Sequence, residues 1–382
     1  MTEKGDENYL RGDGKLPVIL AEGETLAHAA RDAVIKCYKF GARTETPKHR
    51  AGVSLGYDAD IIVKVNNPTE APQIYSPVMW DGPETLMQYI LEVTHGIHNN
   101  WKKSPEHPDR WGYTYNERFF EQLPFVFAKI KKDFEKKGHI SSRQYQFAIW
   151  RAGEDVVPEQ PDPPCLQRGH LRFLQDNKRE WVLNYCTDWR SRCLFKAWNS
   201  NNVAQIELMK LIGMKVSDML GIPIRLGVYS DRSSSLHLYG LYFDKENIGR
   251  TIEETIIPNK KPELYFRSLD DYFYDKTQVK RLVAAQKDAA DKGLGKQLNE
   301  DALIKLGYDT DTFSYPLEWD SWPKSWDAEP DYSKLARVYS DDEIVKRARQ
   351  LLGLSKEDFE KAVATARKES NDWFLSHDNF ME

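Results

Sequence analysis

The stretch from residue 143 to residue 230 constrains the fold most, because strand-like and helix-like patterns alternate in it. Four segments combine β-branched or aromatic residues with turn residues at their ends: 143–150, 170–174, 181–187 and 225–230. One long helical pattern, 202–220, separates the last two. Amphipathic patterns predict further helices over 21–39, 83–94 and 121–136, and a strand over 59–65. Together these patterns predict an α+β protein.

The length and composition predict one large domain with a small appendage. The 382 residues are 40% hydrophobic, which is enough for a buried core. Residues 1–20 are polar and predict a flexible N-terminus, and residues 21–310 then form the main domain. Residues 311–382 change to a Trp-, Pro- and Asp-rich loop followed by two short helices. The sequence predicts that these helices begin at Ser340 and Ser355, because each serine opens a capping signature. Residues 311–382 are therefore expected to be a loop and helical hairpin extension.

Charge and cysteine content exclude several classes of protein. The formal net charge of −5 provides no basic field for nucleic acid, so we expect no direct nucleic-acid binding. No stretch approaches the roughly 18 apolar residues of a membrane span, and the first residues do not resemble a secretion signal. Four cysteines without a CxxC pair indicate reduced thiols. We therefore expect a cytoplasmic protein without a membrane partner.

A metal site is not predicted. His95 and His98 lie three residues apart at the end of the helix expected over 83–94, but the sequence supplies no cysteine or acidic partner that would complete a zinc set. They are expected to be a surface pair. The segment 41–50 is expected to be a loop with four basic or potentially basic side chains.

Three short segments in one half of the chain carry residue types suited to chemistry. The proline-rich linker 158–164 is stiff and extended, and it delivers Cys165 to the start of a predicted strand. Asp188-Trp189-Arg190-Ser191 follows, with Arg190 lying 25 residues after Cys165. Ser235-Leu236-His237-Leu238-Tyr239-Gly240 comes next, with His237 lying 47 residues after Arg190. Each segment alone is common in sheet proteins, so their order and spacing carry the prediction.

In this order and spacing, the three segments resemble the thymidylate synthase superfamily, which includes the pyrimidine nucleotide hydroxymethylases. The resemblance covers roughly residues 25 to 245. It implies a thymidylate synthase-like fold, with a large mixed sheet packed against helices and a homodimer formed through the face of the sheet. It also implies a pyrimidine nucleoside monophosphate as substrate and methylenetetrahydrofolate as cosubstrate.

The resemblance assigns Cys165 as the nucleophile that adds to C6 of the pyrimidine. This addition is needed because C5 becomes nucleophilic only after a thiolate attacks its neighbour. Arg190 and Ser191 would hold the phosphate, and His237 and Tyr239 would hold the sugar hydroxyl. Arg190 would also help the Cys165 thiol to ionise.

Several further arginines are expected around a phosphate dianion, because planar guanidinium groups grip it best together. Arg43 and Arg50 from the basic loop are candidates. Arg143 is another, since the family reaches an arginine at about this offset into the partner's site across the dimer interface. The resemblance therefore implies two sites that are shared between subunits.

The base is expected to be read by a side-chain amide, and uracil is favoured because Asn can donate to O4 and accept from N3–H. Counting from Arg190 selects Asn201 for this role, whereas the flanking Val203-Ala204 pattern selects Asn202. Tyr115 matches the family's tyrosine near the base. The general acid-base carboxylate is predicted to be Glu92, with Glu84 and Glu117 as alternatives.

Three departures from the thymidylate synthase pattern all concern the folate side. Leu166 stands where a His usually follows the nucleophile, Cys193 stands at the pterin-binding Asp position, and residues 376–382 lack a short apolar closing tail. Less water exclusion favours water over hydride as the final reactant. The prediction is a dUMP hydroxymethylase. The alternatives are a methyl-forming thymidylate synthase, a dCMP or CMP hydroxymethylase, and a catalytically silent nucleotide-binding homologue.

Overall fold

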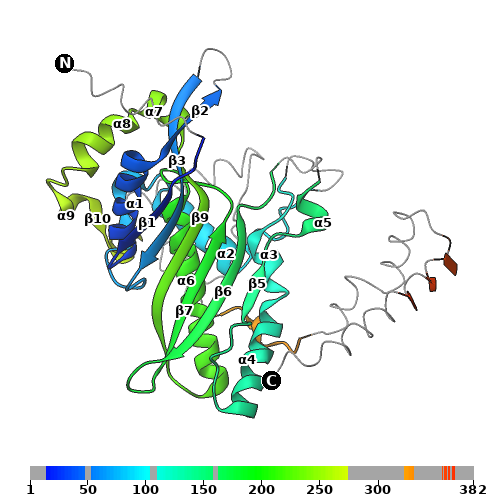
Figure 1. The fold of residues 1–382 in the computed structure, drawn as a ribbon. Coiled ribbons are helices and arrows are strands. Elements are labelled where there is room, and N and C mark those ends of the chain that lie inside the picture. The colour runs from blue at the N-terminus through cyan, green and yellow to red at the C-terminus, as the bar shows by residue number, and fades with distance from the viewer. Residues whose placement is uncertain are drawn as a thin grey trace, which may run out of the picture. The chain divides into compact units, whose positions relative to one another are not determined.

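The computed structural model describes residues 14–47, 53–103, 110–157, 162–273 and 322–330, together with 355, 357, 358, 360, 361, 364 and 365. Contacts divide the chain into two compact units, Met1–Ala328 and Glu329–Glu382. The first unit contains a long twisted sheet with helices packed against it (Figure 1).

In the described part of the chain, eight strands form one mixed sheet in the order β1-β3-β9-β7-β6-β5, with β2 paired to β3 and β8 to β9. The pairs β1–β3, β7–β9 and β8–β9 are parallel, and the others are antiparallel. The strands of this sheet are β1 Val18–Gly23, β2 Ala42–Pro47, β3 Val53–Val65, β5 Gln146–Ala148, β6 Leu166–Gln175, β7 Trp181–Trp189, β8 Arg192–Cys193 and β9 Ile224–Leu238. Two short strands, β4 Ile74–Tyr75 and β10 Phe266–Arg267, pair separately.

Helix α6, Trp198–Leu220, is the central helix of the fold and is buried along most of its length. It packs against β9 and against α1, α2 and α4. The other α-helices are α1 Leu26–Phe40, α2 Pro83–Thr94, α3 Tyr115–Phe120, α4 Leu123–Lys137, α5 Ala152–Asp155, α7 Gly240–Glu246, α8 Ile248–Thr251, α9 Pro262–Tyr265 and α10 Leu269–Phe273. Short turns of other helical types are η1 Ser76–Val78, η2 Ile252–Ile256 and η3 Lys324–Asp327.

One face of the sheet forms the core and the other does not. In β7, Leu183, Tyr185 and Thr187 are buried, whereas Asn184 between them is only half-buried and Cys186 is exposed. This alternation is what a strand with one covered face requires. The predicted α+β class, with a large mixed sheet packed against helices, is confirmed.

Several predicted elements are confirmed with small shifts in their ends. Helix α2 has the predicted bounds, and α4 begins and ends within two residues of the prediction. Strands β6, β7 and β9 extend beyond the predicted cores, and α6 begins at Trp198 rather than at residue 202. Pairing along the sheet lengthens strands past the residues whose own side chains favour them.

Two local predictions are wrong. Residues 18–20 are part of β1 rather than flexible, because parallel pairing with β3 buries Ile19 and Ala21 while neighbouring side chains stay exposed. The first helix consequently begins at Leu26. Residues 42–47 form β2 instead of a loop, because β3 offers them a pairing edge.

The aromatic segment 111–118 runs into a helix. Helix α3 begins at Tyr115, and the Thr114 Oγ1 atom caps it by accepting a hydrogen bond from the Glu117 amide at 3.1 Å. This cap fixes the direction in which Tyr115 leaves the turn.

The unit Glu329–Glu382 is described at few positions. Its helix opens as predicted at Ser355, whose Oγ accepts a hydrogen bond from the Asp358 amide at 3.1 Å. The start predicted at Ser340 lies outside the described residues.

Candidate active site

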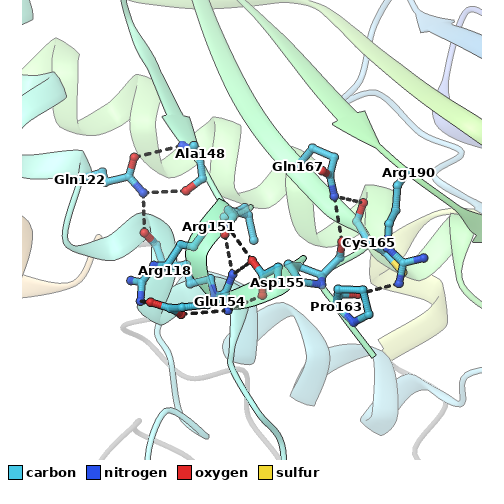
Figure 2. A network of polar contacts seen from close by, with 12 residues as sticks. Arg118, Gln122, Ala148, Arg151, Glu154, Asp155, Pro163, Cys165, Gln167 and Arg190 are labelled. Carbon is cyan, nitrogen blue, oxygen red and sulfur yellow. Dashed lines mark hydrogen bonds and ion pairs between the residues drawn. The ribbon is translucent and has the colours of Figure 1, made fainter. Parts of the chain in front are cut away.

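Cys165 lies immediately before β6 on a turn that is held in place from both sides. Arg190 donates from Nη2 to the Pro163 carbonyl at 2.6 Å and from Nε to the Pro164 carbonyl at 3.1 Å. Its backbone amide donates to the Cys165 carbonyl at 2.8 Å. Figure 2 shows Gln167 completing the turn, with its Nε2 donating to the Pro164 carbonyl at 2.8 Å. The half-buried thiol is therefore presented by a rigid backbone.

Two guanidinium groups act on this thiol. Burial raises the pKa of Cys165 above its ordinary value, Arg190 lowers it in part, Asp162 raises it, and Arg192 lowers it. Because the net shift is upward, the thiol is protonated at neutral pH in this state. Arg190 acts on the pKa of the thiol in the predicted direction, but it does not offset the effect of burial here.

Arg192 is a second cation that the sequence analysis missed. Its guanidinium is buried, forms an ion pair with Asp231, donates from Nε to Ser233 Oγ at 3.1 Å and lies 4.0 Å from the Trp189 ring centre. The sequence contains a signal for this arginine in β9, where Asp231 and Ser233 occupy alternate, buried positions. Strand β8, which contains Arg192, pairs with β9. A buried carboxylate and hydroxyl require such a partner.

The two candidate base-reading asparagines lie in different surroundings. Asn202 is fully buried, and its Oδ1 accepts hydrogen bonds from Tyr229 Oη at 2.7 Å and Arg192 Nη1 at 3.2 Å. Asn201 is half-buried and donates from Nδ2 to Tyr89 Oη at 2.8 Å. Only Asn201 therefore lies toward the side chains that line the cavity described next.

A cavity of about 420 Å³ lies beside the turn that carries Cys165. Tyr113, Tyr115 and Asp162 belong to its wall, and all three interact electrostatically with Cys165. Burial raises the pKa of the Tyr115 phenol, and so does the nearby Cys165. The remaining lining residues are Tyr89, Glu92, Val93, His98, Asn99, Lys103, Arg110, Trp111, Gly112 and Thr114.

Glu92, the predicted acid-base carboxylate, lines this cavity and is engaged by two donors. Its Oε1 lies 2.6 Å from His98 Nδ1 and accepts from Gln88 Nε2 at 3.0 Å. The alternative Glu117 pairs with Lys102 at the start of α3, and the side chain of Glu84 lies outside the described part of the chain.

The prediction that His95 and His98 form a surface pair is wrong for His98, which is only 4% exposed. The chain reverses at Gly96, whose φ of +66° is a conformation that glycine adopts readily, and this turn returns His98 toward Glu92. A side chain at this glycine would meet Asn116 Oδ1 at 2.3 Å. The carboxylate partner of His98 is Glu92, six residues earlier in the sequence, and the turn at Gly96 brings the two side chains together.

The predicted sugar-binding residues lie at the end of β9. His237 is half-buried and pairs in register with Asp58 of β3 and Cys193 of β8. Burial lowers its pKa, and Asp58 raises it in part. The Tyr239 ring lies 5.9 Å from that of His237. No contact among the described residues joins this pair to Cys165. Ser191 is half-buried between Arg190 and β8.

Arg43 and Arg143, two of the additional arginines predicted for the phosphate, have no contact with Arg190 among the hydrogen bonds and ion pairs of the described residues. Arg43 lies on β2, where its Nη2 donates to Tyr57 Oη at 3.3 Å. Arg143 is exposed just before β5, and its carbonyl lies 3.2 Å from His170 Nε2. Arg50 lies outside the described residues.

Among the residues that the structure describes, no helix combines the length and apolarity needed to cross a membrane. The same residues contain no group of three or more His, Cys, Asp or Glu side chains arranged to hold a metal ion.

Comparison with known proteins adds a likeness to solved structures. A solved thymidylate synthase is similar to this chain. The protein is thermostable thymidylate synthase A from Bacillus subtilis, with a TM-score of 0.43 and 13% sequence identity over 60% of this chain and 84% of the other. No family model matches the chain, and neither does any curated protein sequence. Roles for individual residues therefore rest on the geometry of this chain.

Proposed function

We propose that this protein transfers a one-carbon unit from methylenetetrahydrofolate to C5 of a pyrimidine nucleoside monophosphate, with dUMP as substrate and 5-hydroxymethyl-dUMP as product. The observation that carries the proposal is a half-buried thiol on a rigid turn, acted on by two arginines and by Tyr113, Tyr115 and Asp162 from the wall of the neighbouring cavity. A nucleophile, an anion-binding group and a surface for a planar ring are thus combined in one place.

Cys165 is the nucleophile that adds to C6 of the pyrimidine in this proposal. Arg190 holds the nucleotide phosphate, with Ser191 beside it, and 37% of the Arg190 side chain is exposed to a ligand. Arg192 is held near the thiol by buried partners, among them the Asp231 carboxylate, and it lowers the pKa of the thiol in part. The thiolate thus has a second guanidinium nearby that does not bind the phosphate.

Asn201 reads the base, and support comes from its hydrogen bond to Tyr89 at the cavity wall. An amide can donate to O4 and accept from N3–H of uracil. Asn202 instead stabilises the buried position of Arg192. His237 and Tyr239 hold the sugar hydroxyl, at the end of the strand next to the one that carries Arg190.

The cavity suits the reduced folate by its chemistry. Trp111, Tyr113 and Tyr115 present flat rings to a heterocycle, and Lys103 and Arg110 provide cations for the carboxylates of a folate tail. When bound, the folate supplies one carbon at the oxidation level of formaldehyde. The side chains of this chain orient the acceptor ring and hold the anionic ends.

A homodimer completes the proposal, as the resemblance implied. Support comes from the apolar side chains Val18, Leu20 and Leu174 on the uncovered face of the sheet, which are 73%, 58% and 46% exposed. Arg143 lies at the edge of this sheet and would reach the partner's phosphate site. Mixing Cys165→Ser with Arg143→Gln protein should restore activity through one intact shared site per heterodimer.

The direct test is incubation with dUMP and methylenetetrahydrofolate, with the product identified by mass. We expect 5-hydroxymethyl-dUMP, and thymidylate as the only product would contradict the proposal. Tritium release from C5 of UMP, dUMP, CMP and dCMP identifies the accepted nucleotide. A 5-fluoro-dUMP adduct should form with the parent protein and with Cys186→Ser, a control that removes an exposed thiol, but not with Cys165→Ser.

A further inference from the structure

His98 is the one histidine of the described cavity wall, and its two ring nitrogens are in different surroundings. Nδ1 lies 2.6 Å from Glu92 Oε1. Since an ionised carboxylate can only accept, Nδ1 carries the proton and a neutral ring has its lone pair on Nε2. That nitrogen is buried and has no hydrogen-bond partner among the described residues. A buried acceptor without a protein partner can accept a hydrogen bond or a proton from a bound molecule.

The ring of His98 is held rigidly. Its neighbours are Glu92 at one edge and the Trp111 ring, which lies at 72° with the centroids 5.9 Å apart. Glu92 is held in turn by Gln88. This is the arrangement in which a carboxylate fixes the tautomer and the orientation of a histidine that acts as a base.

We infer that His98 is the general base that activates water in this cavity, and that Glu92 is the residue that positions it. The inference rests on the proposed function, and it assigns the step that makes the product a hydroxymethyl group rather than a methyl group. It also moves the acid-base role from the carboxylate to the imidazole that the carboxylate orients. Asn99 belongs to the same cavity wall, and its Oδ1 accepts from Thr114 Oγ1 at 2.6 Å, which leaves a second lone pair on this oxygen for a bound water.

The step balances with water as the only added reactant. After carbon transfer, the nucleotide is bonded to the Cys165 sulfur at C6 and carries an exocyclic methylene at C5. The water oxygen bonds to the methylene carbon while its proton passes to His98 Nε2, and the electron pair of the exocyclic double bond moves to an enolate at O4. As the carbonyl and the C5–C6 double bond re-form, the S–C6 bond breaks and the sulfur leaves as a thiolate, to which the proton is returned.

The test separates the early steps from water addition in single turnovers with dUMP and methylenetetrahydrofolate. Tritium release from C5 reports carbon transfer, and mass analysis reports hydroxymethyl product. For His98→Gln we expect tritium release within about threefold of the parent and product formation lower by about 10²–10³-fold. Added 2-mercaptoethanol should then capture the methylene as a thioether. The control His95→Gln, one turn away and outside the cavity wall, should behave as the parent.

Variants of Glu92 provide a second route if His98→Gln folds poorly. Glu92→Gln keeps an acceptor for Nδ1–H, so product formation should fall less than in Glu92→Ala, with tritium release retained in both. If His98→Gln and Glu92→Ala both show the parent's ratio of product to released tritium, the role of His98 as general base is overturned, while the proposed function stands. No tritium release by the parent protein overturns the proposed function and the inference with it.

Discussion

The buried ion pair between Arg118 and Asp155 supports the wall of the cavity, and its removal should cost much of the folding stability. Arg118 is 3% exposed, and the Asp155 side chain is fully buried. Asp155 accepts from both terminal nitrogens of Arg118 and from the Arg151 amide at 2.7 Å (Figure 2). Arg118 also donates to the Ile149 carbonyl at 2.8 Å and lies 4.6 Å from the centre of the Tyr113 ring.

Asp155→Ala removes two of the three hydrogen-bond acceptors of this guanidinium and leaves the buried cation with the exposed Glu154 carboxylate, at 3.5 Å, as its ionic partner. Breaking a buried pair in this way costs about 3–5 kcal/mol, which is a large part of the roughly 5–15 kcal/mol that stabilises a folded protein. In the double variant Arg118→Met with Asp155→Leu, no charge remains buried, so most of that loss should be recovered.

Urea unfolding followed by tryptophan fluorescence and circular dichroism measures both effects. The control is Glu254→Gln, which breaks an exposed pair with Arg250 and should leave the unfolding midpoint unchanged. A loss below about 1 kcal/mol in Asp155→Ala, or a double variant as unstable as the single one, would refute the assignment of this stability to the buried charges.

Three further outcomes are expected. Burial raises the pKa of Asp155, but the hydrogen bonds from Arg118 and Arg151 together lower it by more than burial raises it, so the net shift is downward. Its stabilisation is thus present above the ordinary carboxyl pKa of about 3.9 and lost as pH falls through the lowered value; an unfolding midpoint that is independent of pH below 4 would contradict this. Burial keeps the pKa of Cys165 high, so iodoacetamide should alkylate this thiol more slowly at pH 7 than it alkylates free cysteine. Arg192→Gln should slow the alkylation further, as measured from the mass of the peptide that contains Cys165. Faster alkylation in Arg192→Gln would contradict the role of Arg192 as a second cation near the thiol. Asn201→Asp should shift the preference from dUMP toward dCMP by about 10²-fold in kcat/KM, and an unchanged ratio would remove Asn201 from base reading.

The class of the fold and the positions of its long elements could be predicted because their side-chain patterns are strong. The 83–94 helix has a proline at its first position and a continuous apolar stripe, and its ends match the prediction. Strand β1 and strand β2 could not be predicted in this way. Each depends on pairing with β3, which no local pattern of their own sequence reveals.

Parts of the candidate site that rest on the order and spacing of motifs could be predicted, whereas contacts that depend on a turn or on strand register could not. Cys165 and Arg190 could be paired because the proline linker and the strand spacing are visible in the chain. The pairing of Glu92 with His98 depends on the reversal at Gly96, and the burial of Arg192 depends on register with β9. Both are tertiary consequences, so the sequence could propose a nucleophile but could not reveal the groups that surround it.

The hydrogen bonds from Arg190 to Pro163 and Pro164 have a mechanical consequence for specificity. They tie the proposed phosphate anchor to the two residues directly before the reactive sulfur, so the span between anchor and sulfur is set by backbone and cannot be adjusted by side-chain rotation. A nucleoside without its phosphate, or a diphosphate with a longer reach, would present C6 at the wrong distance from the sulfur. Under the proposed function, the protein would then select its substrate by length as well as by the pattern of the base.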